Sequence, residues 1–158
     1  KTNIMDMLQK RFLFIVLSFC FFRTSHQTQF YTQLLKSQRN EDIYWPNCKY
    51  LVVCKRDTYE SCKDWAHNIF EKKKKNICPI VSIPKWYTKP IGSKYLIQKS
   101  IYILEMRVPI FIDWEENFAK ANNINLYPTI ILIKTENENT TELRRVFGEY
   151  SNSKLALF

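Results

Sequence analysis

Behind the N-terminal end, apolar residues in the first half of the chain form a short continuous run and then a long helical repeat. Residues 49–54 are rich in Leu and Val, which is typical of a buried strand. Over residues 60–75 apolar side chains recur every three or four positions, which predicts a helix with one buried face. That face is expected to consist of Cys62, Trp65, Ala66, Ile69 and Phe70.

The second half of the chain alternates strand and helix patterns. Three apolar runs predict strands, and a fourth run, after a polar turn, predicts the hairpin partner of the third: residues 78–83, 108–113, 129–134 and 142–147. A short helix with an acidic start is expected over 114–122. Ser151 is the expected N-cap of a terminal helix over 152–158. Residues 95–107 have mixed periodicity and predict no element.

The N-terminal end carries an apolar run that predicts a signal peptide. Lys10 and Arg11 precede a run of apolar and small residues that ends before Arg23. A membrane-spanning helix needs about 20 such residues, and this run is shorter. We therefore expect a leader over residues 1–22, a single domain over 23–158, no transmembrane span and a secretory route; a buried helix is the alternative for the apolar run.

Residues 23–40 contain no Asp or Glu but several basic and hydroxyl side chains. This composition suits a transit peptide placed behind a signal peptide, as in a two-part plastid leader. The alternative, which we favour, is a first amphipathic helix in which Phe30, Leu34 and Leu35 share a face. The expected destination is the ER lumen or secretion, and a plastid-type organelle is the alternative.

The composition is that of a globular protein and excludes several kinds of chemistry. The chain is 46% hydrophobic and 25% charged, with only 2 Gly and 2 His. So few glycines exclude Gly-rich phosphate loops, and so few histidines argue against a Ser-His-Asp triad or a His-rich zinc site. The formal charge is +9, but the lysine run over 72–75 is best interpreted as the basic end of a helix. We expect no nucleic-acid partner and no cofactor.

The order of the predicted elements and two blocks of sequence resemble the thioredoxin family. Residues 51–63 match the family's strand, active-site loop and helix start, and residues 108–158 contain Tyr127-Pro128 directly before a strand, similar to the family's cis-proline stretch. The resemblance implies an α/β thioredoxin-like fold, with a central mixed sheet flanked by helices. Residues 78–107 have no counterpart, so we expect an insertion there, between the second helix and the third strand.

The active-site loop departs from the family pattern. Members of the family carry two cysteines separated by two residues, and the first cysteine is the nucleophile. Here Tyr59 stands at the nucleophile position and Cys62 at the resolving position, in the sequence Tyr59-Glu60-Ser61-Cys62. The resemblance therefore implies a redox-degenerate member that lacks ordinary dithiol turnover and binds peptides or partner proteins, as chaperone-like support of redox homeostasis.

Four cysteines outside the leader make an even number, as expected in an oxidising compartment: Cys48, Cys54, Cys62 and Cys78. Four cysteines permit three pairings, and Cys54 with Cys62 is one candidate pair. Cys62 is also the candidate catalytic residue, as a reactive thiol at a helix start; its other interpretation is a buried small apolar residue. A zinc site lacks the usual Cys-x-x-Cys spacing, so we expect no metal.

The peptide site implied by the resemblance centres on Pro128. In the family the residue before this proline offers backbone groups to an extended peptide. Here that residue is Tyr127, and Tyr59 is expected to face it across the same groove. The expected partner is thus a protein or an extended peptide, and the oligomeric state stays open.

Two alternative functions and one modification site complete the predictions. The first alternative is a thiol-disulfide oxidoreductase that uses Cys62 alone or with Cys54 or Cys78. The second is a structural subunit of a larger complex. Asn139 begins an Asn-Thr-Thr sequon in the predicted hairpin turn, which predicts N-glycosylation of an exposed side chain.

Overall fold

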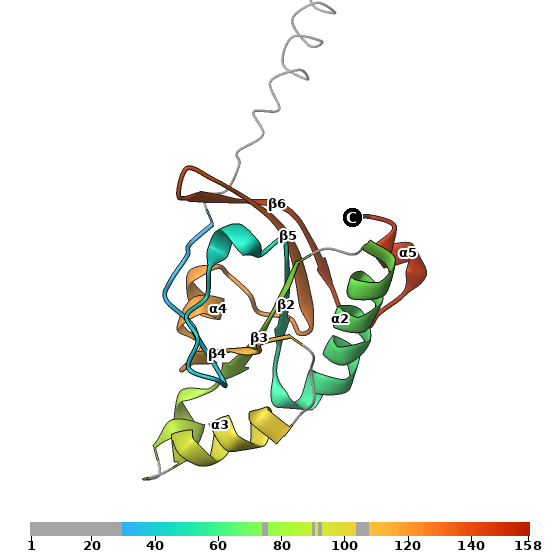
Figure 1. Ribbon diagram of the computed structural model, residues 1–158. Coiled ribbons are helices and arrows are strands. Elements are labelled where there is room, and N and C mark those ends of the chain that lie inside the picture. The colour runs from blue at the N-terminus through green and yellow to red at the C-terminus, as the bar shows by residue number, and fades with distance from the viewer. Residues whose placement is uncertain (1–29, 74–75, 90, 92, 104–107) are drawn as a thin grey trace, which may run out of the picture.

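The computed structural model describes residues 30–73, 76–89, 91, 93–103 and 108–158 (Figure 1). The leader expected over residues 1–22 lies outside the described residues. Among the helices that are described, none combines the length and the apolar character that a bilayer crossing requires.

Six strands form one mixed sheet in the order β1-β4-β3-β2-β5-β6. The three central strands β2, β3 and β4 run parallel, whereas β1, β5 and β6 pair antiparallel with their neighbours. The central mixed sheet that the resemblance implied is therefore confirmed. The strands span Lys36–Ser37 (β1), Tyr50–Cys54 (β2), Ile77–Ile83 (β3), Phe111–Trp114 (β4), Thr129–Glu136 (β5) and Asn139–Phe147 (β6).

Helices cover both faces of this sheet (Figure 1). The helix α2 and the short α5 pack on one face, and α4 lies on the other beside the segment that precedes β2. α3 lies at the same end of the sheet as the start of α2. The α-helices span Tyr59–Lys73 (α2), Ser93–Ile103 (α3), Asn117–Ala121 (α4) and Asn152–Leu155 (α5), and the 3-10 turns span Trp45–Asn47 (η1), Arg56–Thr58 (η2) and Lys85–Thr88 (η3).

The central strands are continuous apolar runs because both of their faces are buried. All residues of β2 and β3 are buried, and alternate residues of β2 belong to different cores. Val52 faces the core beneath α2, where Trp65 is fully buried, whereas Val53 faces the core beneath α4, where Phe118 is fully buried. The two cores fix the position of β2, at whose carboxyl end the candidate site begins.

Most predicted elements are present with small shifts of their ends. The predicted strands, the long helix and the terminal helix form, and the Ser151 side chain accepts a hydrogen bond from the Lys154 amide as an N-cap. α2 buries four of the five residues expected on its inner face, but Phe70 is 46% exposed. The helix expected over 114–122 is shorter, because β4 continues to Trp114 and α4 begins only at Asn117.

The amphipathic helix expected around Phe30 and Leu35 is wrong for the described part of that segment. Residues 30–35 form no helix; Phe30 and Leu35 are buried, while Leu34 is 72% exposed. The Phe30 amide donates to the Thr140 carbonyl, and the Leu35 carbonyl accepts from the Ile43 amide. The backbone groups of this segment thus form hydrogen bonds with distant residues. In a helix the same groups would bond to residues four positions away in the sequence.

The insertion expected over 78–107 needs a correction at its start. Residues 77–83 belong to the central sheet: they form β3, which pairs with both β2 and β4. Only the residues after Ile83 leave the sheet, and they form η3 and α3, where the sequence predicted no element. The continuous burial of β3 explains the correction, since a run of seven buried residues needs a neighbour on each side.

Candidate functional site

The candidate site lies where the carboxyl ends of the parallel strands meet the start of α2. In open α/β sheets this edge is where ligands usually bind. β2 ends at Cys54 and continues through η2 into Tyr59, the first residue of α2. Val53 pairs with Thr129, and this register places Pro128 next to Cys54. The structure therefore brings the predicted loop, Cys62 and the predicted proline to one end of the sheet.

The four cysteines form two disulfides. Cys54 and Cys62, whose Cα atoms are 6.2 Å apart, form a bridge between β2 and α2, which we call the helix bridge. Cys48 and Cys78, with Cα atoms 5.5 Å apart, form a bridge between η1 and β3, which we call the long-loop bridge. All four side chains are buried, and Cys62 has no exposed surface. The bridges leave none of these thiols free for a zinc ion, and in the described residues no group of His, Cys, Asp or Glu is arranged as metal ligands.

Tyr59, at the position that the resemblance assigns to the nucleophile, is the first residue of α2. The loop before it is closed by Thr58, whose hydroxyl accepts from the Lys55 amide at 3.1 Å and donates to the Lys55 carbonyl at 3.2 Å. Tyr59 is half-buried, and burial, together with the negative charge of Glu60, raises the pKa of its phenol above 10.0. Its phenol, neutral at physiological pH like that of any tyrosine, can donate and accept hydrogen bonds.

Lys55 links the helix loop to the loop that carries the proline. Its Nζ lies 2.7 Å from Oε1 of Glu116 and 4.5 Å from the centre of the Tyr127 ring. The hydrogen bond to Glu116 is the largest cause of the raised pKa of Lys55. Glu116 itself has a φ of 59°, an uncommon left-handed conformation for a side chain of this size. Lys55 thus stays charged while it holds three segments together.

Asp113 is a buried carboxylate that sequence analysis did not single out. It accepts hydrogen bonds from the amides of Phe118 at 2.8 Å and Ala119 at 3.0 Å and from the Ser82 hydroxyl at 2.9 Å. Burial raises the pKa of Asp113, and the three hydrogen bonds oppose that rise. An Asp after an apolar strand and before a helix is the signal that could have revealed it, because such a carboxylate satisfies the first amides of the helix.

The peptide bond between Tyr127 and Pro128 is cis. Tyr127 is half-buried, and its hydroxyl contacts the Ile124 carbonyl at 3.4 Å. Burial raises the pKa of Tyr127, while a hydrogen bond with Ser82 and the charge of Lys55 oppose the rise. The Pro128 carbonyl accepts from the Gly148 amide at 2.9 Å, so the loop is fixed to the end of β6.

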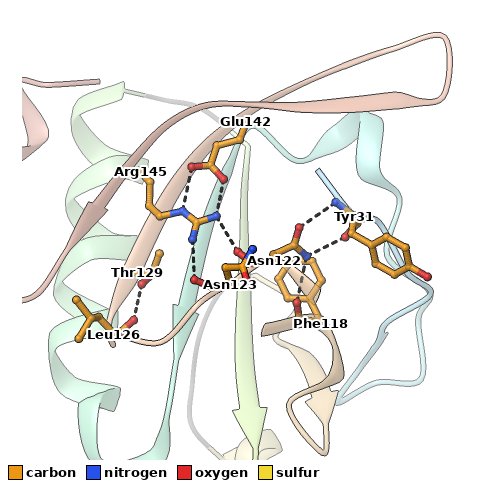
Figure 2. A network of polar contacts seen from close by, with 8 residues as sticks. All are labelled: Tyr31, Phe118, Asn122, Asn123, Leu126, Thr129, Glu142 and Arg145. Atoms are coloured by element: carbon orange, nitrogen blue, oxygen red, sulfur yellow. Dashed lines mark hydrogen bonds and ion pairs between the residues drawn. The ribbon is translucent and has the colours of Figure 1, made fainter. Parts of the chain in front are cut away.

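A polar network holds the same loop from its other side (Figure 2). Arg145 pairs with Glu142, with Nε and Oε1 2.9 Å apart, and donates to the carbonyls of Asn122 and Asn123 at 2.9 and 3.1 Å. The Asn122 side chain in turn bonds both backbone groups of Tyr31, each at 2.9 Å. The loop that leads to Tyr127 is therefore held between β6 and the N-terminal segment.

The predicted glycosylation residue lies apart from this site. Asn139 is the first residue of β6 and pairs with Glu136 at the hairpin end of β5, whereas Pro128 precedes the opposite end. Its side chain is exposed, and the Thr141 hydroxyl donates to the Lys134 carbonyl at 3.3 Å. Asn139 is therefore an accessible residue that takes no part in the candidate site.

Comparison with known proteins gives matches in structure alone. No protein-family profile and no curated protein sequence matches the chain. An exposed lipoprotein thioredoxin of Streptococcus pneumoniae is similar with a TM-score of 0.60 at 13% identity, covering 79% of this chain and 95% of that protein. A thiol-disulfide isomerase of Corynebacterium glutamicum has a TM-score of 0.57 at 13% identity, covering 84% and 93% of the two chains.

A third similar structure is StoA of Bacillus subtilis, with a TM-score of 0.54 at 16% identity, covering 78% of this chain and 92% of that one. At such low identities the matches establish the architecture alone. The chain has the thioredoxin-like fold, as the resemblance of its sequence implied.

Proposed function

We propose that this thioredoxin-like chain binds extended segments of partner proteins beside Tyr59, Tyr127 and Pro128 and does not run a dithiol–disulfide cycle. The observation that carries the proposal is the state of position 62. Cys62 has no exposed surface and is bonded to Cys54, while the helix start carries a phenol instead of a thiol. Thiol–disulfide exchange requires that a thiolate reach a sulfur atom, and burial of both sulfurs opposes that approach.

The same arrangement is suited to binding. A partner segment that lies along the backbone of Tyr127, just before the start of β5, would use backbone hydrogen bonds, with neighbouring side chains providing selectivity. Tyr59 and Tyr127 offer hydroxyls that, like ordinary tyrosine phenols, are neutral at physiological pH. The bonds of Pro128 to β6 and of Asn122 to the N-terminal segment hold the loop in place before a partner arrives, which lowers the entropic cost of binding.

One observation favours a second candidate function, a thiol-disulfide oxidoreductase that uses Cys62 with Cys54. The helix bridge lies at the start of α2, where the resemblance places the reactive pair of the family. In that reaction an incoming thiolate attacks one sulfur of the bridge and forms a mixed disulfide, and the other sulfur leaves as a thiolate. A second thiol of the partner then completes its own disulfide and leaves Cys54 and Cys62 reduced.

One experiment separates the two functions. The wild-type protein and Cys62→Ser are tested for reduction of insulin by dithiothreitol and for binding of an unfolded, cysteine-free peptide. We expect no acceleration of insulin reduction by either protein, and peptide binding that Tyr127→Ala weakens. Wild-type acceleration that Cys62→Ser abolishes would instead establish the oxidoreductase. Tyr44→Ala is the control for binding, since Tyr44 is 63% exposed and belongs to the segment before η1.

We further propose that the chain follows the secretory route to the ER lumen or the cell exterior, with a plastid-type organelle as the alternative. Two disulfides and an exposed sequon asparagine support an oxidising, lumenal environment. Mass spectrometry of the protein purified from its own cells without reductant tests this. We expect loss of the leader, four hydrogens fewer than the reduced mass, and a glycan on Asn139.

A further inference from the structure

A pocket of about 910 Å³ opens beside the candidate site. Its walls come from the loop after β2, the carboxyl end of β3, and the segment of η3 and α3 that follows. Its volume lies within the usual range of small-ligand and side-chain pockets. The lining residues of the pocket are Lys55, Arg56, Asp57, Tyr59, Val81, Ser82, Ile83, Pro84, Trp86, Tyr87 and Ile97.

The pocket is continuous with the proposed peptide site. Tyr59 and Lys55 line it, and Lys55 also lies over the Tyr127 ring. Ser82, another lining residue, hydrogen-bonds Asp113 in the cluster beneath the proline loop. A segment laid along Tyr127 would therefore reach the pocket with one of its next side chains.

The outer wall of the pocket is aromatic and exposed. Trp86 stacks on Tyr87 with ring centres 3.6 Å apart and planes inclined by 26°, yet 62% of Trp86 is exposed. Three more large apolar side chains of the same segment are exposed to a similar or greater extent: Ile91, Tyr95 and Leu96. A concentration of exposed apolar side chains beside a concave surface indicates an interaction site, and aromatic residues are frequent anchors in such sites.

The charge of this wall is positive. Residues 84–103 contain four lysines and no Asp or Glu. Arg56 lines the pocket and is exposed, and it forms no ion pair within the described part of the chain. The acidic lining residue is Asp57, and Lys55 is already paired with Glu116. Arg56 is thus a donor available to a ligand carboxylate, and because Asp57 formally offsets its charge, the excess positive charge around the pocket comes from the lysines of residues 84–103.

We infer that the pocket receives an aromatic or large aliphatic side chain of an acidic partner segment, with its neighbouring carboxylate paired to Arg56. The inference rests on the proposed function and specifies the class of peptide that the site prefers. Trp86 and Tyr87 supply the apolar contact, and Arg56 supplies a forked donor that matches a carboxylate. A basic, apolar surface also suits an anionic bilayer, but the concave shape of the pocket favours a protruding side chain.

Binding of three labelled peptides to the full chain tests the inference by fluorescence anisotropy. One peptide carries a Phe flanked by Glu, the second replaces Glu with Lys, and the third replaces Glu with Gln. We expect the acidic peptide to bind about tenfold more tightly than the neutral one, a difference of about 1.4 kcal/mol. Arg56→Glu should remove the preference for the acidic peptide. Trp86→Ala should weaken the binding of the acidic peptide by a similar factor. Arg39→Glu and Tyr44→Ala change exposed residues of the same types elsewhere and should have no effect.

The outcomes distinguish this inference from the proposed function. If all three peptides bind equally well and Tyr127→Ala weakens the binding of each, the preference of the pocket for acidic segments is overturned. The proposed peptide site is then retained. If no peptide binds the wild-type protein, the proposed function and the inference both fail. Vesicles of phosphatidylserine and phosphatidylcholine form a fourth arm; loss of vesicle binding in Trp86→Ala, without a peptide preference, would assign the surface to a membrane instead. Arg56→Glu alters an exposed side chain, so it keeps the test valid if Trp86→Ala does not fold.

Discussion

Asp113 provides the sharpest test of how the site is held together. Its carboxylate is completely buried and accepts from two amides of α4 and from Ser82. Asp113→Ala leaves these three donors without an acceptor, and each unsatisfied buried donor costs about 1–3 kcal/mol. Removal of a buried carboxylate offsets part of that loss, so we expect the free energy of unfolding to fall by about 2–4 kcal/mol. Urea unfolding measures the change as a lower midpoint with an unchanged m-value.

The pH dependence of the same variant carries the stricter test. Burial raises the pKa of Asp113 in the folded protein above its ordinary value of 3.8. The folded state therefore binds this proton more tightly than the unfolded state does. The resulting stability is fully present below pH 3.8 and is lost as the pH rises through the higher folded pKa. As the pH rises from 3.8 through the folded pKa, the wild-type protein should thus lose stability relative to Asp113→Ala, which lacks this carboxyl group.

We therefore expect the deficit of Asp113→Ala to be largest at acid pH and to become smaller toward neutrality. Urea titrations at several pH values from 3 upward follow this difference, and Asp57→Ala is a control because its carboxyl is exposed. A deficit that grows with pH would mean that the three hydrogen bonds outweigh burial. That result would refute our account of the Asp113 pKa.

Three further predictions concern the scaffold. Removal of the long-loop bridge should lower the free energy of unfolding by about 3.5 kcal/mol, and removal of the helix bridge by about 2.5 kcal/mol, because the two bridges close loops of 30 and 8 residues. Urea unfolding of the two double Cys→Ala variants shows which bridge contributes more to stability. Arg145→Ala should cost about 1–2 kcal/mol and speed hydrogen exchange near Asn122, whereas Arg144→Ala should leave that exchange unchanged. Ser151→Ala should cost about 1 kcal/mol in thermal unfolding because α5 loses its N-cap.

The elements with one dominant pattern could be predicted from the sequence. β2, α2 and the hairpin of β5 and β6 have strong periodicity or continuous apolar runs, and these patterns follow directly from burial on one or two faces. α3 could not be predicted in this way. Among the α3 side chains whose burial is described, Tyr95 and Leu96 are exposed and the apolar one that packs on the core is Ile97, so this part of the helix has no broad buried face to impose a period on its sequence.

The residues of the candidate site could be named from the sequence, but their contacts could not. Tyr59, Cys62 and Pro128 follow from the resemblance, because each occupies a position that the family motif defines. The roles of Lys55 and Asp113 depend on Glu116 and Ser82, which are distant in the sequence and become neighbours only through the order of the strands. A pairing of this kind leaves no periodic signal. The choice among three disulfide pairings was open for the same reason.

Under the proposed function, the helix bridge explains how the fold could keep a binding surface without a reactive thiol. In the arrangement that the resemblance implies, the partner of Cys62 would be a thiol at position 59, the first residue of the helix. Here the partner is Cys54, at the buried end of β2, and both sulfurs lie in the core beneath α2. The covalent bond thus joins the start of α2 to the sheet, and the position that the resemblance assigns to a nucleophile carries the phenol of Tyr59. If this reasoning is correct, Tyr59→Cys combined with Cys54→Val should accelerate insulin reduction, whereas Tyr59→Cys alone should not, because Cys62 would remain bonded to Cys54.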